Sequence, residues 1–333
     1  MPSSFLQTGL FLCYDEKGVP LSCAGSGQDG EYLSGVQWPE HRFQADGKGR
    51  VTDLLTGLMW PQSANLFEFP VTWDEALAAI KTANRENLLG YEDWRLPNRR
   101  ELRSLISHGA KKPALPVDHP FTNVYLTWYW TSTSAAIAPG YAWYVHMEGG
   151  RMFYGKKDGY SLLWPVRGET AVLPATGQRQ CFAVSGHPVE CPGTGQDGEV
   201  QSGLPWPSPR FERHSRGVRD CLTGLIWHPD ADFSQKLLTW EEALAEIHAL
   251  NDQGASTWRL PNINELESLV DASTHSPALP VDHPFMNPRD GYWSSTTSFF
   301  EPDWSYVLYL TKGAVGVGHK AGREFFAWPV SGP

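Results

Sequence analysis

The chain contains a long internal repeat, and this repeat constrains the fold more than any other feature of the sequence. The string WRLPNRREL at residues 94–102 returns as WRLPNINEL at residues 258–266, an offset of 164 residues. Further pairs follow in the same order, including VTDLLTGLMW with VRDCLTGLIW, PALPVDHPFTN with PALPVDHPFMN, and YWTSTS with YWSSTT. Self-similarity at a fixed offset indicates copies of one folding unit. We therefore predict two tandem domains in the 333 residues.

The limits of these domains follow from where the matching strings begin and end. We predict an N-terminal lead-in with a disulfide hairpin at residues 1–26 and a first domain at residues 27–168. A linker with a second disulfide hairpin should occupy residues 169–194, and a second domain residues 195–333. Similar strings, GSGQDGEYLSGVQWP and GTGQDGEVQSGLPWP, introduce the two domains.

Local signals predict an α+β architecture for each copy. Thr72 with Glu75, and Asn98 with Glu101, have the spacing of a capping box, so a helix should begin at each place. The second copy repeats both signals. Glycine-rich turns separate short β-prone segments before the helices, and we expect hairpins around residues 148–150 and 312–313 after them. This order predicts an antiparallel sheet with two segregated helices in each domain.

Folding explains every repeated letter of the WRLPN strings except the arginine. Pro97 keeps the preceding residues extended, and Asn98 is a natural N-cap. An arginine fork commonly pairs with a carboxylate. We therefore expect Arg95 and Arg259 to tie the extended segment to the helix, with a ligand role as the alternative.

Four of the five cysteines form two pairs with equal spacing. Cys13 and Cys23 are ten residues apart, as are Cys181 and Cys191, and each pair brackets a turn-like stretch. This pattern favours two disulfides formed in an oxidising compartment. Reduced thiols or a metal site are the alternatives, although zinc is disfavoured because close CxxC spacing and a His partner are missing. Cys221 stands where the first copy has Leu54, so we expect it to be a small core residue.

Charge and hydropathy exclude some classes of protein. Residues 1–168 carry 16 Lys/Arg and 17 Asp/Glu, whereas residues 169–333 carry 11 and 20, so the second half holds most of the net charge of −10. This balance disfavours nucleic acid as a partner. No apolar run is long enough for membrane insertion, and the first residues lack the features of a signal peptide. The disulfide pattern nevertheless favours export to the periplasm or cell surface; removal of a leader stays open.

The repeated strings resemble the C-terminal domain family of the Legionella collagen-like adhesin. The resemblance is carried by TDLLTGLMW, WRLPNRREL, YWTSTS and WPVRG in the first copy, and by LTGLIW, WRLPNINEL, YWSSTT and WPVSG in the second. The GQDGE lead-ins are also typical of bacterial members. The resemblance implies a C-type-lectin-like fold, related to formylglycine-generating enzymes and to retroelement-diversified receptors. It implies ligand display more than chemistry.

Several candidate chemistries lack the residues that they need. The copper-binding cysteines of the formylglycine-generating relatives have no counterpart, since no cysteine follows Cys221. Asp118-His119 and Asp282-His283 are adjacent in Pro-rich loops, where a turn role outweighs acid/base or metal chemistry. The hydroxyls of YWTSTS and YWSSTT lack a positioned base. The Glu-Pro-Asn, Gln-Pro-Asp and Trp-Asn-Asp tripeptides of calcium-dependent lectins are missing, and EPD at residues 301–303 matches them only in part. We expect no catalytic residues, no metal and no cofactor, with calcium left open.

The two copies diverge after the YW strand, and we place the ligand-binding faces there. Aromatic and cationic side chains suit stacking on sugars and pairing with acidic groups. About half of the aromatic side chains should face the core, whereas the Lys and Arg should be exposed. The candidate residues in the first copy are Tyr141, Trp143, Tyr144, His146, Arg151, Tyr154, Lys156 and Lys157. Those in the second copy are Phe299, Phe300, Trp304, Tyr306, Lys312, His319, Lys320 and Arg323.

The leading hypothesis is a non-enzymatic binding or adhesion protein that displays variable faces to a glycan or protein ligand. The alternatives are an enzyme of the sulfatase-modifying branch with altered chemistry, a structural module of a pilus or phage tail, and a retroelement-diversified receptor. The sequence leaves the oligomeric state open.

Overall fold

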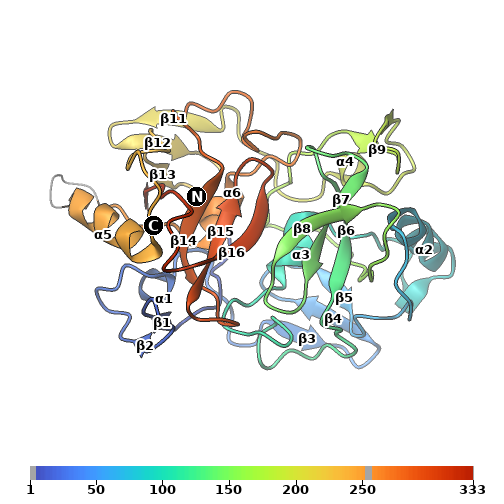
Figure 1. Cartoon of the computed structure of the whole chain (residues 1–333). Coiled ribbons are helices and arrows are strands. Elements are labelled where there is room, and N and C mark those ends of the chain that lie inside the picture. Colours follow the sequence, from blue (N-terminus) through green and yellow to red (C-terminus); the bar gives the residue numbers. More distant parts are fainter. Residues whose placement is uncertain (1–4, 252–256, 333) are drawn as a thin grey trace. The chain divides into compact units, whose positions relative to one another are not determined.

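The computed structural model describes residues 5–251 and 257–332, which form two compact units (Figure 1). One unit combines residues 5–37 and the short stretch Ser107–Ala110 with the chain from Trp206 onward. The other combines Trp38–Ile106 with Lys111–Pro205. We call residues 38–168 the first repeat, residues 206–332 the second repeat, residues 5–37 the first lead-in and residues 173–205 the second lead-in. Apart from residues 107–110, each unit therefore contains one repeat and the lead-in that precedes the other repeat.

This grouping differs from the order along the chain. The predicted limits joined residues 27–37 to the first repeat and residues 195–205 to the second, because each lead-in immediately precedes that repeat. In the structure, the first lead-in packs with the second repeat, and the second lead-in packs with the first repeat. Figure 1 shows the blue first lead-in beside the orange and red second repeat.

The unit of the first repeat has the expected order of strands, helices and strands. A three-stranded antiparallel meander comes first, then two α-helices around a short 3-10 helix, then a second three-stranded antiparallel sheet. The elements of the repeat are β3 (Phe43–Ala45), β4 (Arg50–Asp53), β5 (Met59–Pro61), α2 (Trp73–Arg85), η1 (Leu88–Gly90), α3 (Arg99–Ser104), β6 (Trp128–Ser134), β7 (Tyr141–His146) and β8 (Met152–Lys156). The second lead-in adds β9 (Cys181–Phe182), β10 (Pro188–Val189) and α4 (Asp197–Val200).

The unit of the second repeat follows the same plan. Its meander gains a fourth strand from the end of the chain, so the order is β11, β12, β13, β17. The elements of the repeat are β11 (Phe211–His214), β12 (Gly217–Asp220), β13 (Ile226–Trp227), α5 (Trp240–Asn251), α6 (Ile263–Ser268), β14 (Gly291–Thr297), β15 (Trp304–Tyr309), β16 (Ala314–His319) and β17 (Val330–Ser331). The first lead-in contributes β1 (Cys13–Tyr14), β2 (Pro20–Leu21) and α1 (Asp29–Tyr32). The α+β prediction of two helix-containing antiparallel domains is confirmed at this level.

The capping boxes begin the helices where the sequence predicts. Thr72 caps α2 and Asn98 caps α3, and in both cases the side chain of the glutamate three residues on accepts a hydrogen bond from the backbone N–H of the cap residue. Thr239 and Glu242 exchange the same two hydrogen bonds at the start of α5. These polar contacts close the first turn while the opposite face of the helix is buried.

Tryptophans form the centre of each core. In the first repeat, Trp73 of α2 packs with Trp94 and Trp130, and in the second repeat Trp240 of α5 packs with Trp258 and Trp293. The helix tryptophan also donates to a backbone carbonyl of the neighbouring strand, from Trp73 Nε1 to Thr131 O at 2.7 Å. Large apolar burial of this kind dominates the stability of a domain.

The expected hairpins are present, and the last segment of each copy is less regular than these hairpins. β7 and β8 pair from Tyr141 with Lys156 to Val145 with Met152. β15 and β16 pair in the same way around the turn at residues 310–313. The segment at residues 162–167 makes isolated bridges instead of a named strand, and only Val330–Ser331 forms one in the second copy.

The GQDGE letters build the lead-in itself. The amide of Gln28 accepts a hydrogen bond from Tyr14 N and donates one to Tyr14 O, both at 3.0 Å, so it fastens the cysteine hairpin to α1. A Cβ at Gly30 would lie 2.9 Å from both sulfurs of the disulfide, which explains the glycine. Glu31 accepts from the backbone of Gly25 and Gly27. The second lead-in repeats the Gln and Glu contacts with the corresponding residues.

Both disulfides that the spacing favours are present, joining Cys13 to Cys23 and Cys181 to Cys191. Cys221 is half-buried with a reduced thiol. No helix within the two described ranges combines the length and apolar character needed to cross a bilayer.

Candidate ligand-binding surface and the lead-in docking site

Strands β6, β7 and β8 carry a cluster of partly exposed aromatic side chains on one face of their sheet. Trp128 stacks on Tyr144 with ring centroids 4.1 Å apart, and it meets His146 edge-on at 4.6 Å and Phe153 at 6.3 Å. All four side chains are half-buried. The pairing of Trp128 with His146 and of Tyr144 with Phe153 places them together, because paired residues point to the same side of a sheet. We call these four residues the aromatic cluster.

Glycine and charge shape the neighbourhood of this cluster. A Cβ at Gly155 would lie 3.0 Å from the Tyr144 ring, so the glycine allows the ring to lie across β8. Burial raises the pKa of Tyr144 and keeps its phenol protonated. Burial, together with the nearby charge of Arg151, lowers the pKa of His146, while Glu148 opposes this shift. The exposed guanidinium of Arg151 therefore supplies the positive charge beside a neutral imidazole at pH 7.

The second repeat has different side chains at the positions of the aromatic cluster. Its strand register puts Gly291, Val307 and Gly316 where the first repeat has Trp128, Tyr144 and Phe153. The vacated volume is occupied by Phe325, which is 6% exposed and contacts Trp293 at 4.8 Å between centroids. A Cβ at Gly291 would lie 2.6 Å from this ring. The aromatic cluster is therefore a property of the first repeat.

The structure distributes the predicted ligand residues of the first copy between surface and core. Arg151 and Lys156 are exposed, and Tyr141, Tyr144, His146 and Tyr154 are half-buried. Trp143 is 1% exposed and points to the other face, where Arg99 lies over its ring at 4.1 Å. Tyr141 and Tyr154 also belong to that other face and meet edge-on at 5.8 Å. Only Tyr144, His146 and Arg151 from the predicted set therefore lie at the aromatic cluster.

The predicted residues of the second copy are also divided. His319 and Arg323 are exposed, and Phe299, Phe300, Trp304 and Lys312 are half-buried. Tyr306 is 1% exposed and belongs to the core. Arg323 forms a two-pronged ion pair with Glu242 at the start of α5. His319 lies edge-on to Trp304 at 5.4 Å and 3.5 Å from Asp303. His319 and Arg323 are therefore each engaged by an acidic side chain of the second repeat.

The expectation that the lysines are exposed is wrong for Lys157 and Lys320, which are both 0% exposed. Lys157 Nζ donates to Phe182 O at 2.9 Å in the second lead-in and lies 3.9 Å from the centre of the Trp73 ring. Lys320 makes the equivalent contacts with the first lead-in and Trp240. Burial lowers the pKa of each ammonium to about 7. Both lysines hold a lead-in in place, which explains why both copies retain them in an otherwise divergent segment.

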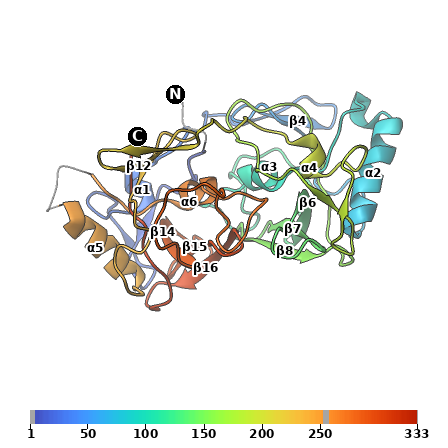
Figure 2. The ribbon, with the colours of Figure 1, turned by 90° about the horizontal axis from the view of Figure 1, so that it is seen from above.

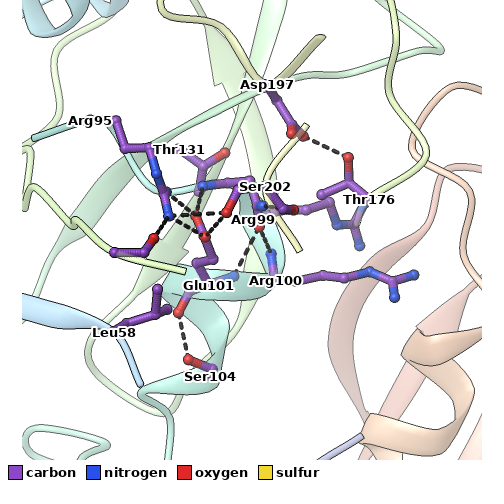
Figure 3. Close-up of polar contacts among 12 residues, drawn as sticks. Leu58, Arg95, Arg99, Arg100, Glu101, Ser104, Thr131, Thr176, Asp197 and Ser202 are labelled. Atoms are coloured by element: carbon purple, nitrogen blue, oxygen red, sulfur yellow. Dashed lines mark hydrogen bonds and ion pairs between the residues drawn. The ribbon is translucent and has the colours of Figure 1, made fainter. Parts of the chain in front are cut away.

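The arginines of the WRLPN strings also hold the lead-ins, as Figure 3 shows for Arg95. Arg95 forms a two-pronged ion pair with Glu101 of α3, as expected, and its Nη2 donates to Ser202 Oγ at 3.0 Å. Ser202 donates in turn to Glu101 at 2.8 Å, and Asn98 donates to the Ser202 carbonyl. The prediction of a strand-to-helix ion pair is confirmed. The serine was missed, although each lead-in carries it in an LSG or QSG string.

A buried carboxylate completes each docking site. Asp197 accepts hydrogen bonds from Thr133 of β6 at 2.6 Å and from Thr176 at 2.7 Å. Asp29 accepts the same bonds from Thr296 of β14 and Thr8. Burial raises the pKa of both carboxyls to about 6, and the threonine hydrogen bonds oppose this effect. Figure 2 shows α1 beside β14 and α4 beside β6. The aspartate of GQDGE therefore anchors the lead-in to the YW strand.

The other motifs are mostly engaged in packing. Thr131 donates to the Trp143 carbonyl, and Ser132 is 2% exposed, so these YWTSTS hydroxyls lie inside the structure. His119 and His283 lie against Phe121 and Phe285, and burial lowers the pKa of each imidazole. Across residues 5–251 and 257–332, the His, Cys, Asp and Glu side chains form no group of three that could hold a metal ion.

The two repeats match one known domain family. The family model described as Lcl C-terminal domain matches residues 49–167 and again residues 216–331. The chain therefore belongs to the Lcl C-terminal domain family and contains two copies of the domain, as the resemblance of the repeated strings implied. The search of curated proteins found no match.

Proposed function

We propose that this protein is a non-enzymatic, exported adhesin-type protein that binds a carbohydrate at the aromatic cluster of its first repeat. The observation that carries this proposal is the group of partly exposed rings in which Trp128 stacks on Tyr144 and meets Phe153 edge-on, beside His146 and Arg151. Sugar rings present C–H faces that pack on aromatic rings, and an Arg fork pairs with sulfate or carboxylate groups. This combination favours an acidic glycan.

Membership of the Lcl C-terminal domain family supports an adhesin-like role, and the two disulfides support export. We assign each repeat to the C-type-lectin-like class on the basis of the resemblance and the α+β order. In this proposal, the first repeat binds the ligand and the second repeat binds little or nothing at the equivalent face. Its Gly291, Val307 and Gly316 offer no stacking surface.

The test is binding of the full chain to an array of neutral and sulfated glycans, followed by titration of the strongest hit. Trp128→Ala should lower the affinity by about 2- to 10-fold, because one stacked ring contributes on the order of 0.5–1.5 kcal/mol. Arg151→Ala should weaken binding of sulfated glycans and leave neutral ones little changed. Trp304→Ala, a matched change of a half-buried tryptophan in the second repeat, serves as the control.

Equal losses for Trp128→Ala and Trp304→Ala would remove the first repeat as the specific site. Absence of any glycan hit, combined with specific capture of a protein ligand that depends on Trp128, would replace the carbohydrate with a protein partner.

A further inference from the structure

The two lead-ins reach their docking sites by different routes along the chain. The second lead-in follows the first repeat directly and docks onto that same repeat. The first lead-in is joined to the first repeat at Gln37 and Trp38, yet it docks onto the second repeat. Residues 38–205 separate it along the chain from the second repeat, which carries its docking site. The first lead-in is therefore held in place by noncovalent contacts across a very long chain connection.

Those contacts are the same in both units. Asp29 with Thr296 corresponds to Asp197 with Thr133, and the distances are 2.7 and 2.6 Å. Ser34 accepts from Arg259 at 3.1 Å, as Ser202 does from Arg95 at 3.0 Å. A lysine of the repeat donates to the cysteine hairpin in each case. The docking site is therefore specified by side chains of the repeat and not by direct chain continuity.

The docked lead-in buries charged and polar groups alongside its own apolar side chains Phe5, Leu6 and Leu10, and the polar groups favour reversible docking over permanent burial. The Asp29 carboxyl, the Lys320 amine and the ion pair of Arg259 with Glu265 are all buried when the first lead-in is in place. Without the lead-in, these polar groups regain water, which offsets part of the contacts that are lost. The disulfide and the Gln28 contacts keep the lead-in itself folded, so it moves as a preformed element.

We propose that the first lead-in is an exchangeable docking element, which binds the second repeat of another copy of this chain and links two chains. An exchanged lead-in makes the same contacts with the second repeat of the other chain that it makes with the second repeat of its own chain. Exchange of an identical element is a low-cost route to association. The balance between closed monomer and linked chains then depends on two concentrations. One is the protein concentration, and the other is the effective concentration at which residues 38–205 hold the lead-in near its own docking site. The second lead-in, which follows its repeat directly, stays with its own chain.

Wild-type chains give the first test. Two preparations with different affinity tags are mixed at high concentration, warmed below the unfolding transition, diluted and purified through both tags in succession. Exchange predicts a doubly tagged species with twice the mass of one chain, whose amount rises with the concentration during mixing. A chain mass that stays single at every concentration contradicts exchange in the wild type.

A complementing pair of full-length variants gives the second test. Asp29→Lys disables the first lead-in and keeps the docking site of the second repeat, whereas Thr296→Lys disables that docking site and keeps the lead-in. Each variant alone should remain monomeric, and an equimolar mixture should form a 1:1 dimer by native mass spectrometry. Glu40→Lys, an exposed position that receives the same charge change as Asp29→Lys, is the control and should form far less dimer with Thr296→Lys.

Formation of the 1:1 dimer supports the proposal, even where the wild type exchanges slowly. Equal amounts of dimer with Asp29→Lys and with Glu40→Lys overturn it, because docking would then be independent of the aspartate. The absence of both the wild-type mixed species and the variant dimer also overturns it.

Discussion

The guanidinium of Arg95 donates a hydrogen bond to the hydroxyl of Ser202 at 3.0 Å, although 107 residues separate them. Arg259 repeats this relationship with Ser34 across 225 residues. In both cases the arginine also forms an ion pair with a helix glutamate, Glu101 or Glu265. One side chain therefore links the extended WRL segment, the helix and the lead-in. The WRLPN strings, which are the most faithfully repeated part of the sequence, therefore form part of the docking site for the lead-ins.

Loss of charge at Glu101 should destabilise the unit of the first repeat. Glu101→Gln preserves volume but leaves Arg95 without its buried carboxylate partner, and removal of one member of such a pair costs about 3 kcal/mol. Chemical denaturation of the full chain measures the change. Glu75→Gln is the matched control, since Glu75 holds the same capping position in α2 but is exposed, and it should cost about 0.5–1 kcal/mol. Equal costs would contradict the proposed importance of the ion pair.

Removal of the first disulfide should destabilise the lead-in. A closed loop of this length restricts the unfolded chain by about 3 kcal/mol, so Cys13→Ser with Cys23→Ser should lower the free energy of unfolding by roughly that amount. The same variant should make residues 5–37 more susceptible to limited proteolysis. Cys221→Ser, which affects a half-buried thiol outside both disulfides, is the control and should change little. Unchanged proteolysis of the lead-in would show that its docking contacts suffice.

The buried aspartates should make stability depend on pH. Their pKa is about 6 in the folded chain against an ordinary value of 3.8, so the folded state binds the proton more tightly. Each carboxyl contributes about 3 kcal/mol to the free energy of unfolding when it is protonated in the folded chain. This contribution is complete below about pH 4 and is lost as the pH rises through about 6. Asp29→Asn should flatten the profile between pH 4 and 6. A profile identical to that of the wild type would contradict the raised pKa.

The buried lysines act over a higher range of pH. Their pKa is lowered to about 7 by burial, so the folded state favours the neutral amine. Their contribution is fully present above about pH 10.5 and is lost as the pH falls through about 7. Lys157→Met should therefore reduce the rise of stability between pH 7 and 10 in denaturation experiments. Lys156→Met, at an exposed neighbouring position, should leave that rise unchanged.

Phe325 should be coupled to Gly291 in the second repeat. Phe325→Ala opens a cavity and should cost about 3–5 kcal/mol, whereas Phe326→Ala, at a half-buried position, should cost less. Gly291→Ala overpacks the wild type because its Cβ would meet the Phe325 ring at 2.6 Å. The double variant should be more stable than the sum of the single effects implies, as measured by a double-mutant cycle. Simple additivity would indicate that the ring moves away freely.

Local interactions account for what the sequence predicts well. The capping boxes at Thr72, Asn98 and Asn262 formed because their partners lie three residues away, within one helical turn. The hairpins and the cysteine pairs also involve short separations. Helix and strand order could therefore be predicted from neighbouring residues alone.

Contacts between distant segments account for what was missed. The docking of each lead-in depends on pairs such as Asp29 with Thr296, 267 residues apart, which no local pattern specifies. A signal existed in the lysine shared by both divergent faces, Lys157 and Lys320. Trp128 of the proposed binding site was missed because it lies just before the divergent segment, although Gly291 in the corresponding position of the second copy was visible in the sequence.

The grouping of lead-ins and repeats has a consequence for how the coding sequence can be rearranged. The chain has the connectivity of a circular permutant. The segment that completes the unit of the second repeat, residues 5–37, comes first in the chain. A gene that starts at Trp38 and encodes residues 5–37 after the second repeat, through a flexible spacer, would make both units contiguous. The boundary of the duplicated sequence and the boundary of the folded unit are thus different, and truncations designed from the repeat alone would separate each repeat from the segment that covers its buried charges.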